Sequence, residues 1–215
     1  MRSNDFRIGL AAMLAAVVIP AAASAQTKPL ALEVRGGASR SVLDLNDGIG
    51  LMSFPNGEPA AAADDWGWNW SADMFWTFAR RGAAYIGWNR TKFHCKEEFC
   101  GSDGRIWSAG PEMGFKYWIT QGNSIDPWFR VGLLAHKAKY KEGPAPEENS
   151  VRAPGFELGV GTDLAVGSTF AVVPALRFYR YNAGWDLGTP GEKREKKNIG
   201  WFQGDLGLQL RLGNR

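Results

Sequence analysis

The chain has 215 residues, of which 45% are hydrophobic and 22% are charged, a composition that excludes a disordered or collagen-like protein. Lys and Arg number 25 and Asp and Glu 22, so the formal net charge is only +3 and we expect no nucleic-acid partner. Glycine (27) and tryptophan (10) are abundant, whereas histidine and cysteine occur only twice each. This usage suits packed strands with bulky rings that face lipid, and it indicates no specific activity.

The first residues have the three parts of a secretory signal peptide. Two arginines give a positive start, an apolar run extends from Ile8 to Ile19, and Ala23-Ser24-Ala25 forms a cleavage site of small residues. The apolar run is shorter than the roughly 20 residues that a membrane-spanning helix needs. We therefore predict a signal peptide over residues 1–25 and a single mature domain over residues 26–215.

Apolar and polar residues alternate with a period of two along the mature chain, which indicates β-strands. The clearest segment is residues 66–78, where one face carries mostly tryptophan and the other mostly small or polar residues. Eight strands are predicted, an even number as in a transmembrane barrel. In chain order they are Leu30 to Arg40, Asp65 to Phe78, Ala83 to Lys92, Arg105 to Ile119, Pro127 to Tyr140, Pro154 to Val166, Thr169 to Asn182 and Ile199 to Leu212.

The predicted connections alternate in length. The short turns are Arg80-Arg81-Gly82, Gln121-Gly122-Asn123-Ser124 and Gly167-Ser168, and the long connections are Ser41 to Asp64, Phe93 to Gly104, Lys141 to Arg152 and Ala183 to Asn198. Short periplasmic turns and longer external loops are the layout of an outer-membrane barrel. We predict an all-β fold, an eight-stranded antiparallel up-and-down transmembrane barrel with both termini on the periplasmic side.

The aromatic residues decide which face of each strand meets lipid. An eight-stranded barrel has an interior just wide enough for side chains, and it could not hold so many alternating rings. We therefore expect these rings to face outward and to form girdles at the two membrane interfaces. The predicted girdle residues are Trp66, Trp68, Trp70, Trp76, Phe78, Trp88, Trp107, Phe129 and Phe202.

The opposite phase places acidic and basic side chains inside. Because an unpaired buried charge costs several kcal/mol, we expect these groups to pair and to close the lumen. The predicted network contains Glu112, Arg130, Glu157, Asp163, Arg177 and Asp205. If residues 167–169 form a three-residue turn, Gly159 faces Arg177, and Glu157 lies diagonal to it. Arg177 and Glu157 are therefore predicted to anchor the network, with Asp205 or Asp163 completing it.

Four features of the chain together resemble a known family. They are the signal peptide, the hairpin layout, and two strand segments, Pro127-Trp128-Phe129-Arg130-Val131-Gly132-Leu133 and Val173-Pro174-Ala175-Leu176-Arg177-Phe178-Tyr179. The chain resembles the small eight-stranded outer-membrane β-barrel proteins of Gram-negative bacteria, the opacity-protein and OmpX-like group. It departs from that family at its end, Leu210-Arg211-Leu212-Gly213-Asn214-Arg215, where the family usually has an aromatic residue. The resemblance implies a monomer in the cell outer membrane, inserted by the barrel assembly machinery and surrounded by lipid and lipopolysaccharide.

Cys95 and Cys100 lie close together in a predicted long connection. In an exported protein such a pair most simply forms a disulfide. The alternative is a zinc site that includes His94, but zinc needs four ligands and no second pair of His or Cys residues is near. We therefore predict a disulfide and no metal.

His136 is the only other histidine, so an enzymatic interpretation depends on it. Some barrels of this size remove acyl chains from lipid A and need a serine close to the histidine on one strand, but Ala138 holds that position here. We expect His136 to form a hydrogen bond with a carboxylate in the lumen. The sequence therefore predicts neither an enzyme nor a cofactor.

Two classes of function stay open. The barrel either maintains the membrane and displays its loops, or its loops bind a host surface, a partner protein or a small ligand; a narrow porin is a further alternative. Apolar residues in the Ser41 to Asp64 connection, such as Leu51 and Phe54, form either a contact surface or a flap packed over the barrel mouth. We expect the flap, because it is the usual behaviour of such loops.

Overall fold

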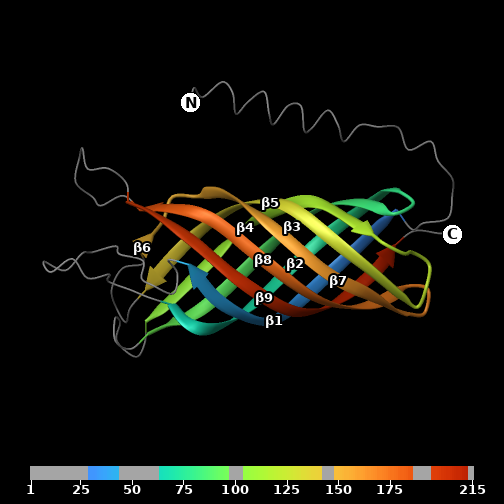
Figure 1. Cartoon of the computed structure of the whole chain (residues 1–215), viewed down its shortest axis with the longest axis horizontal. Coiled ribbons are helices and arrows are strands. Elements are labelled where there is room, and N and C mark those ends of the chain that lie inside the picture. The colour runs from blue at the N-terminus through green and yellow to red at the C-terminus, as the bar shows by residue number, and fades with distance from the viewer. Residues whose placement is uncertain (1–28, 44–62, 97–103, 142–147, 186–194, 213–215) are drawn as a thin grey trace, which may run out of the picture.

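The computed structural model describes residues 29–43, 63–96, 104–141, 148–185 and 195–212. Nine β-strands make up all of its regular structure (Figure 1). They are β1 (Leu30–Leu43), β2 (Ala63–Ala79), β3 (Gly82–Cys95), β4 (Arg105–Trp118), β5 (Ile125–Lys141), β6 (Glu148–Asn149), β7 (Ala153–Val166), β8 (Phe170–Trp185) and β9 (Glu195–Leu212). Among these residues, no helix is long and apolar enough to cross a membrane.

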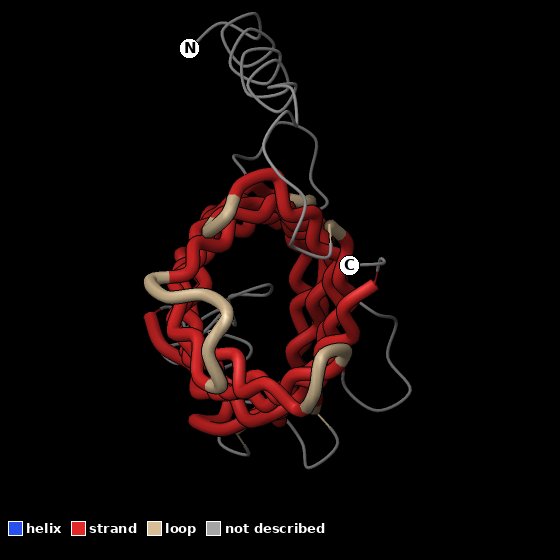
Figure 2. The backbone as a smooth tube through the Cα atoms, turned by 90° about the vertical axis from the view of Figure 1, so that its right-hand side faces the viewer, coloured by secondary structure: helices blue, strands red, loops and turns tan. Residues whose placement is uncertain are grey.

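The eight long strands close into one antiparallel barrel. The sheet order β4-β3-β2-β1-β9-β8-β7-β5 is completed by pairing between β4 and β5, so the ring has no free edge (Figure 2). First and last strands pair over their full common length, from Leu30 opposite Leu212 to Leu43 opposite Ile199. The predicted eight-stranded barrel is thus confirmed. β6 was not predicted, and it adds only two residues beside β5.

Connections of different length separate the two ends of the barrel. The turn end carries the short connections at residues 80–81, 119–124 and 167–169 together with the strand ends Leu30 and Leu212. At the other end, called the loop end here, four strand pairs lead into connections that lie largely outside the described residues (Figure 1). The predicted alternation of short and long connections is confirmed, whereas the predicted flap in the Ser41 to Asp64 connection falls outside the described residues.

The register of β7 and β8 follows from their short turn. Gly167 has a φ of 72°, a conformation that glycine adopts at little cost, and Val166 then faces Phe170. Further along the same pairing, Gly159 faces Arg177 as predicted. This register directs Glu157 and Arg177 into the interior, where both are buried.

The exterior is apolar over most of its height. On β2 the even-numbered residues from Trp66 to Phe78 are exposed, and the odd-numbered residues from Asn69 to Phe75 are buried. All nine predicted girdle residues occupy outward positions, eight of them exposed and Trp107 half-buried. With water outside, such a surface would be unstable, but it suits the hydrocarbon of a bilayer.

Candidate functional site: the charged interior of the barrel

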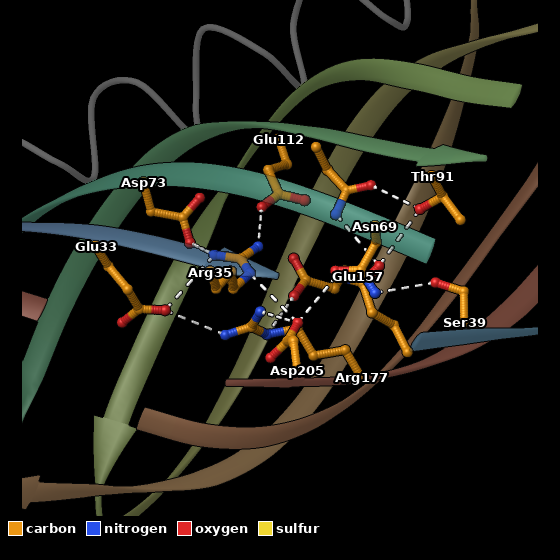
Figure 3. A network of polar contacts seen from close by, with 12 residues as sticks. Glu33, Arg35, Ser39, Asn69, Asp73, Thr91, Glu112, Glu157, Arg177 and Asp205 are labelled. Carbon is orange, nitrogen blue, oxygen red and sulfur yellow. Dashed lines mark hydrogen bonds and ion pairs between the residues drawn. The ribbon is translucent and has the colours of Figure 1, made fainter. Parts of the chain in front are cut away.

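The middle of the barrel is filled by charged side chains from seven different strands (Figure 3). All of these side chains have no exposed surface. This central charge cluster consists of Glu33, Arg35, Asp73, Glu112, Arg130, Glu157, Arg177 and Asp205. The period-two alternation of the strands brings these side chains together, because every member occupies an inward position of its strand.

Arg130 on β5 joins three of the carboxylates. Its Nη1 lies 2.8 Å from Asp73 Oδ2, and its Nη2 lies 2.8 Å from Glu157 Oε2 and 3.2 Å from Glu112 Oε1. Its guanidinium carbon also lies 3.8 Å from the ring centroid of Tyr85, whose hydroxyl donates to Glu157 at 2.8 Å. Arg130 is therefore bound on its edge by carboxylates and on its face by an aromatic ring.

Arg35 on β1 connects strands that do not pair with each other. Its Nη1 donates to Asp73 on β2, and its Nη2 lies 2.6 Å from Glu112 Oε1 on β4. Looser ion pairs join it to Glu33 (3.6 Å) and Asp205 (3.5 Å). The predicted network omitted Arg35 as an anchor, because pairing rules for neighbouring strands do not reveal contacts that cross the lumen.

The two predicted anchors, Arg177 and Glu157, lie in the same cluster, but each lies closer to another residue than the two lie to each other. Arg177 Nη1 lies 2.7 Å from Asp205 Oδ2 and its Nη2 lies 3.3 Å from Glu33 Oε1. The distance from Arg177 Nε to Glu157 Oε1 is 3.5 Å, whereas Arg130 reaches Glu157 at 2.8 Å. Arg177 therefore forms its shortest ion pairs with β9 and β1, and Glu157 forms its shortest ion pair with Arg130.

Asp163 lies apart from the cluster, toward the turn end. Its Oδ1 accepts from Lys116 Nζ at 2.8 Å, and its Oδ2 accepts from Trp118 Nε1 at 2.8 Å. The central charge cluster itself contains five carboxyl groups and three guanidinium groups. Acidic groups are thus in excess at its centre, and loss of any arginine would enlarge that excess.

Two apolar layers enclose the charges. Toward the turn end, inward rings and aliphatic groups include Phe75, Trp118, Trp128 and Val173. Toward the loop end, the second layer includes Trp201, which stacks on Tyr179 with ring centroids 5.0 Å apart. The sequence prediction placed the aromatic residues on the lipid face, with Phe75 as the exception, and it did not find the inward rings Trp118, Trp128 and Trp201.

Glycine provides the space that the arginine stems need. A Cβ placed on Gly159 would lie 2.8 Å from Arg130 Cγ and 3.1 Å from Arg177 Cγ, and the first distance is too short for carbon atoms. Both arginines therefore pass directly over the backbone of β7 at this residue. This close approach explains why β7 has glycine between Glu157 and Asp163 on its inward face.

His136 contacts a serine and aromatic rings rather than the predicted carboxylate. Ser108 Oγ on β4 lies 3.0 Å from His136 Nδ1 and 2.9 Å from Tyr181 Oη. His136 is fully buried and stacks on Trp201. A search along one strand could not find Ser108, because it comes from the neighbouring strand. Serine and histidine thus meet inside the barrel, where both are buried beside the rings of the loop-end apolar layer.

The cysteines and His94 show no metal site within the described chain. Cys95 is buried at the end of β3, His94 is exposed on the opposite face, and Cys100 lies outside the described residues. In the part of the chain that is described, no three His, Cys, Asp or Glu side chains are grouped to hold a metal ion. The disulfide between Cys95 and Cys100 stays a prediction.

Similar proteins are found by structure and not by sequence. No family model and no curated protein matches the chain. Neisserial surface protein A matches with a TM-score of 0.59 at 13% identity, covering 85% of this chain and 97% of its own. The outer membrane protein OprG from Pseudomonas aeruginosa gives 0.54 at 13% identity, over 86% and 98%. The outer membrane protein AlkL gives 0.51 at 12% identity, over 92% and 97%.

These likenesses show that the chain has the fold of the small eight-stranded outer-membrane β-barrel proteins, as the sequence resemblance implied. Its apolar exterior and its buried ion pairs agree with that class. The fold and the exterior together place the protein in the outer membrane of a Gram-negative cell. At such low identity the likeness extends to the fold alone.

Proposed function

We propose that the protein is a closed, non-conducting barrel that has a structural role in the outer membrane and displays its four loop-end connections at the cell surface. The observation that carries this proposal is the central charge cluster, whose side chains have no exposed surface. A hydrated ion would have to separate these ion pairs and displace both apolar layers. Such a passage requires breaking buried pairs, each of which costs several kcal/mol.

The orientation follows from export and from the lengths of the connections. A signal peptide over residues 1–25 would deliver the chain to the periplasm, and the barrel assembly machinery would insert it as a monomer with the turn end on the periplasmic side. Lipid and lipopolysaccharide would then surround the apolar exterior. An unknown surface partner would meet the loop end, which makes an adhesin or a ligand-binding barrel the alternative.

A narrow porin and a lipid A-modifying enzyme are less well supported. The porin needs a continuous aqueous path, and the enzyme needs a nucleophile that a lipid can reach. Ser108 and His136 point into the barrel and are buried. We therefore propose no catalytic role for them.

Conductance separates the closed barrel from the porin. We expect the protein, refolded and inserted into a planar bilayer, to give no steady current, while an unrelated porin in the same chamber gives stable steps. Folding is checked on the same sample by the change in gel mobility on boiling, which a folded barrel shows. A stable ohmic current from the parent protein would refute the closed lumen.

A further inference from the structure

One side of the barrel exterior carries a dense group of positive charges near the loop end. The basic patch consists of six outward side chains on three neighbouring strands, Arg90 and Lys92 on β3, Arg105 on β4, and Lys137, Lys139 and Lys141 on β5. On these three strands, every outward position of the described residues is apolar, basic or His94, and none is acidic. The outward charge of these three strands is therefore entirely positive among the described residues.

The register brings these residues together. Lys92 faces Trp107 on β4, and Trp107 in turn faces Lys139 on β5. The ammonium of Lys139 lies 5.9 Å from the centroid of the Trp107 ring. Directly opposite residues in antiparallel strands have Cβ atoms about 5 Å apart, so the patch is a compact grid around Trp107.

Like charges in this grid oppose one another. Arg90 is the next outward residue to Lys92 on β3, and Arg105 lies diagonal to Lys92 on β4, next to its partner Trp107. Crowded cations are stabilised by an anion that lies among them, and phosphate is an anion that Arg and Lys bind well.

The patch lies at the upper boundary of the apolar belt. From Trp107 to Tyr117 the outward face of β4 runs ten residues, about 33 Å of strand at about 3.3 Å per residue. With a strand tilt of about 40°, this is about 25 Å of height, the thickness of the apolar band of an outer-membrane barrel. If Tyr117 marks the inner interface, Trp107 and the basic patch lie at the headgroups of the outer leaflet.

We propose that the basic patch binds the phosphate groups of a phosphorylated glycolipid of the outer leaflet, the lipid A part of lipopolysaccharide. The acyl chains would lie below it on the exposed apolar side chains of Met113, Leu133 and Ile86. Two phosphates on one rigid headgroup fit a grid of six cations better than the single phosphate of a phospholipid. This assignment rests on the proposed orientation, with the loop end at the cell surface.

The test compares a patch variant with a variant of equal charge elsewhere. The patch variant is Lys92→Gln with Lys137→Gln, and the control is Arg80→Gln with Arg81→Gln in the exposed turn between β2 and β3 at the opposite end. Both replace exposed or half-buried side chains, so both should still show the gel-mobility change on boiling. Binding to the detergent-solubilised full-length protein is measured by native mass spectrometry with purified lipopolysaccharide, its dephosphorylated form and phosphatidylglycerol.

We expect the parent and the control to bind lipopolysaccharide equally and the patch variant to bind it about 30-fold more weakly, which corresponds to about 1 kcal/mol for each of two basic groups near an anionic lipid. The dephosphorylated form should bind the parent as weakly as intact lipid binds the patch variant. Equal binding of both forms, or an unaffected patch variant, would overturn the site. Equal binding of phosphatidylglycerol would overturn the glycolipid assignment. Conductance is measured separately, so a conducting lumen would refute the proposed function and leave the patch untouched.

Discussion

Arg130→Met should destabilise the barrel more than any other single substitution of a charged residue in the interior. Methionine keeps much of the apolar stem but removes the contacts to Asp73, Glu112 and Glu157, three of them at 2.8 Å and one at 3.2 Å. Among the described residues, Glu157 then keeps only the Tyr85 hydroxyl at 2.8 Å and Arg177 at 3.5 Å. Five carboxyl groups would share two guanidinium groups. Breaking a buried pair from one side typically costs about 3 to 5 kcal/mol, and we expect that loss here.

The matched control removes a negative charge from the same cluster. Glu112→Gln keeps an oxygen that accepts from Arg35 and Arg130, and it lowers the acidic excess. Because Glu112 Oε2 has no hydrogen-bond partner among the described residues, the new amide N–H group would be unpaired, at a cost of about 1 to 3 kcal/mol. The reduced repulsion offsets part of this cost. Glu112→Gln should therefore lose less than half as much stability as Arg130→Met.

Urea unfolding in lipid vesicles, followed by tryptophan fluorescence, measures both variants against the parent. Leu208→Ile, on the lipid-facing side of β9, serves as the neutral reference and should leave the unfolding midpoint nearly unchanged. If Arg130→Met were within about 0.5 kcal/mol of the parent, the cluster would not hold the fold as argued, because that is the usual range for surface substitutions. Equal losses for Arg130→Met and Glu112→Gln would refute the importance of the acidic excess.

Two further predictions use the same strands. Gly159→Ala should destabilise the barrel by about 1 to 3 kcal/mol, because its Cβ overlaps Arg130, whereas Gly204→Ala, where an added Cβ meets no atom within 4 Å, should be neutral in the same urea assay. Cys95 and Cys100 should resist thiol labelling in the unreduced protein, and Cys95→Ser should leave the urea midpoint within about 1 kcal/mol, since closing so short a loop constrains the unfolded chain only modestly. Labelling of both thiols without reductant would exclude the bridge.

The fold was predictable because a membrane barrel imposes one simple rule on every strand. Lipid outside and polar groups inside require alternation with a period of two, and the register of each hairpin follows from its turn. The pairing of Gly159 with Arg177 could be derived in this way from the turn at residues 167–169. Strand boundaries at the loop end were less accurate: β8 continues to Trp185 and β9 begins at Glu195, beyond the predicted limits.

The interior partners could not be predicted, because long side chains reach across the lumen. Arg35 on β1 binds Glu112 on β4, although β2 and β3 lie between these strands in the sheet. Ser108 and His136 are hidden for a related reason, since they belong to neighbouring strands with distant sequence positions. The inward Trp201 was missed because its ring has the same phase as Gln203 and Asp205, and alternation alone does not distinguish an interior ring from an interior charge.

The buried charges also explain why this chain closes with one particular face inward. A well-packed apolar interior is often as stable as a buried ion-pair network, so stability alone does not require the cluster. A slip of one residue, however, would move every inward side chain of a strand into lipid. On β9 such a slip would expose Asp205 to hydrocarbon and bury Leu206 among carboxylates. A basic group at the bilayer midplane costs about 2 to 4 kcal/mol, so slips that expose Arg35, Arg130 or Arg177 are the most costly. The cluster thus selects the correct register on each strand that contributes to it. Without it, the many glycines and outward rings of this chain would tolerate several different registers.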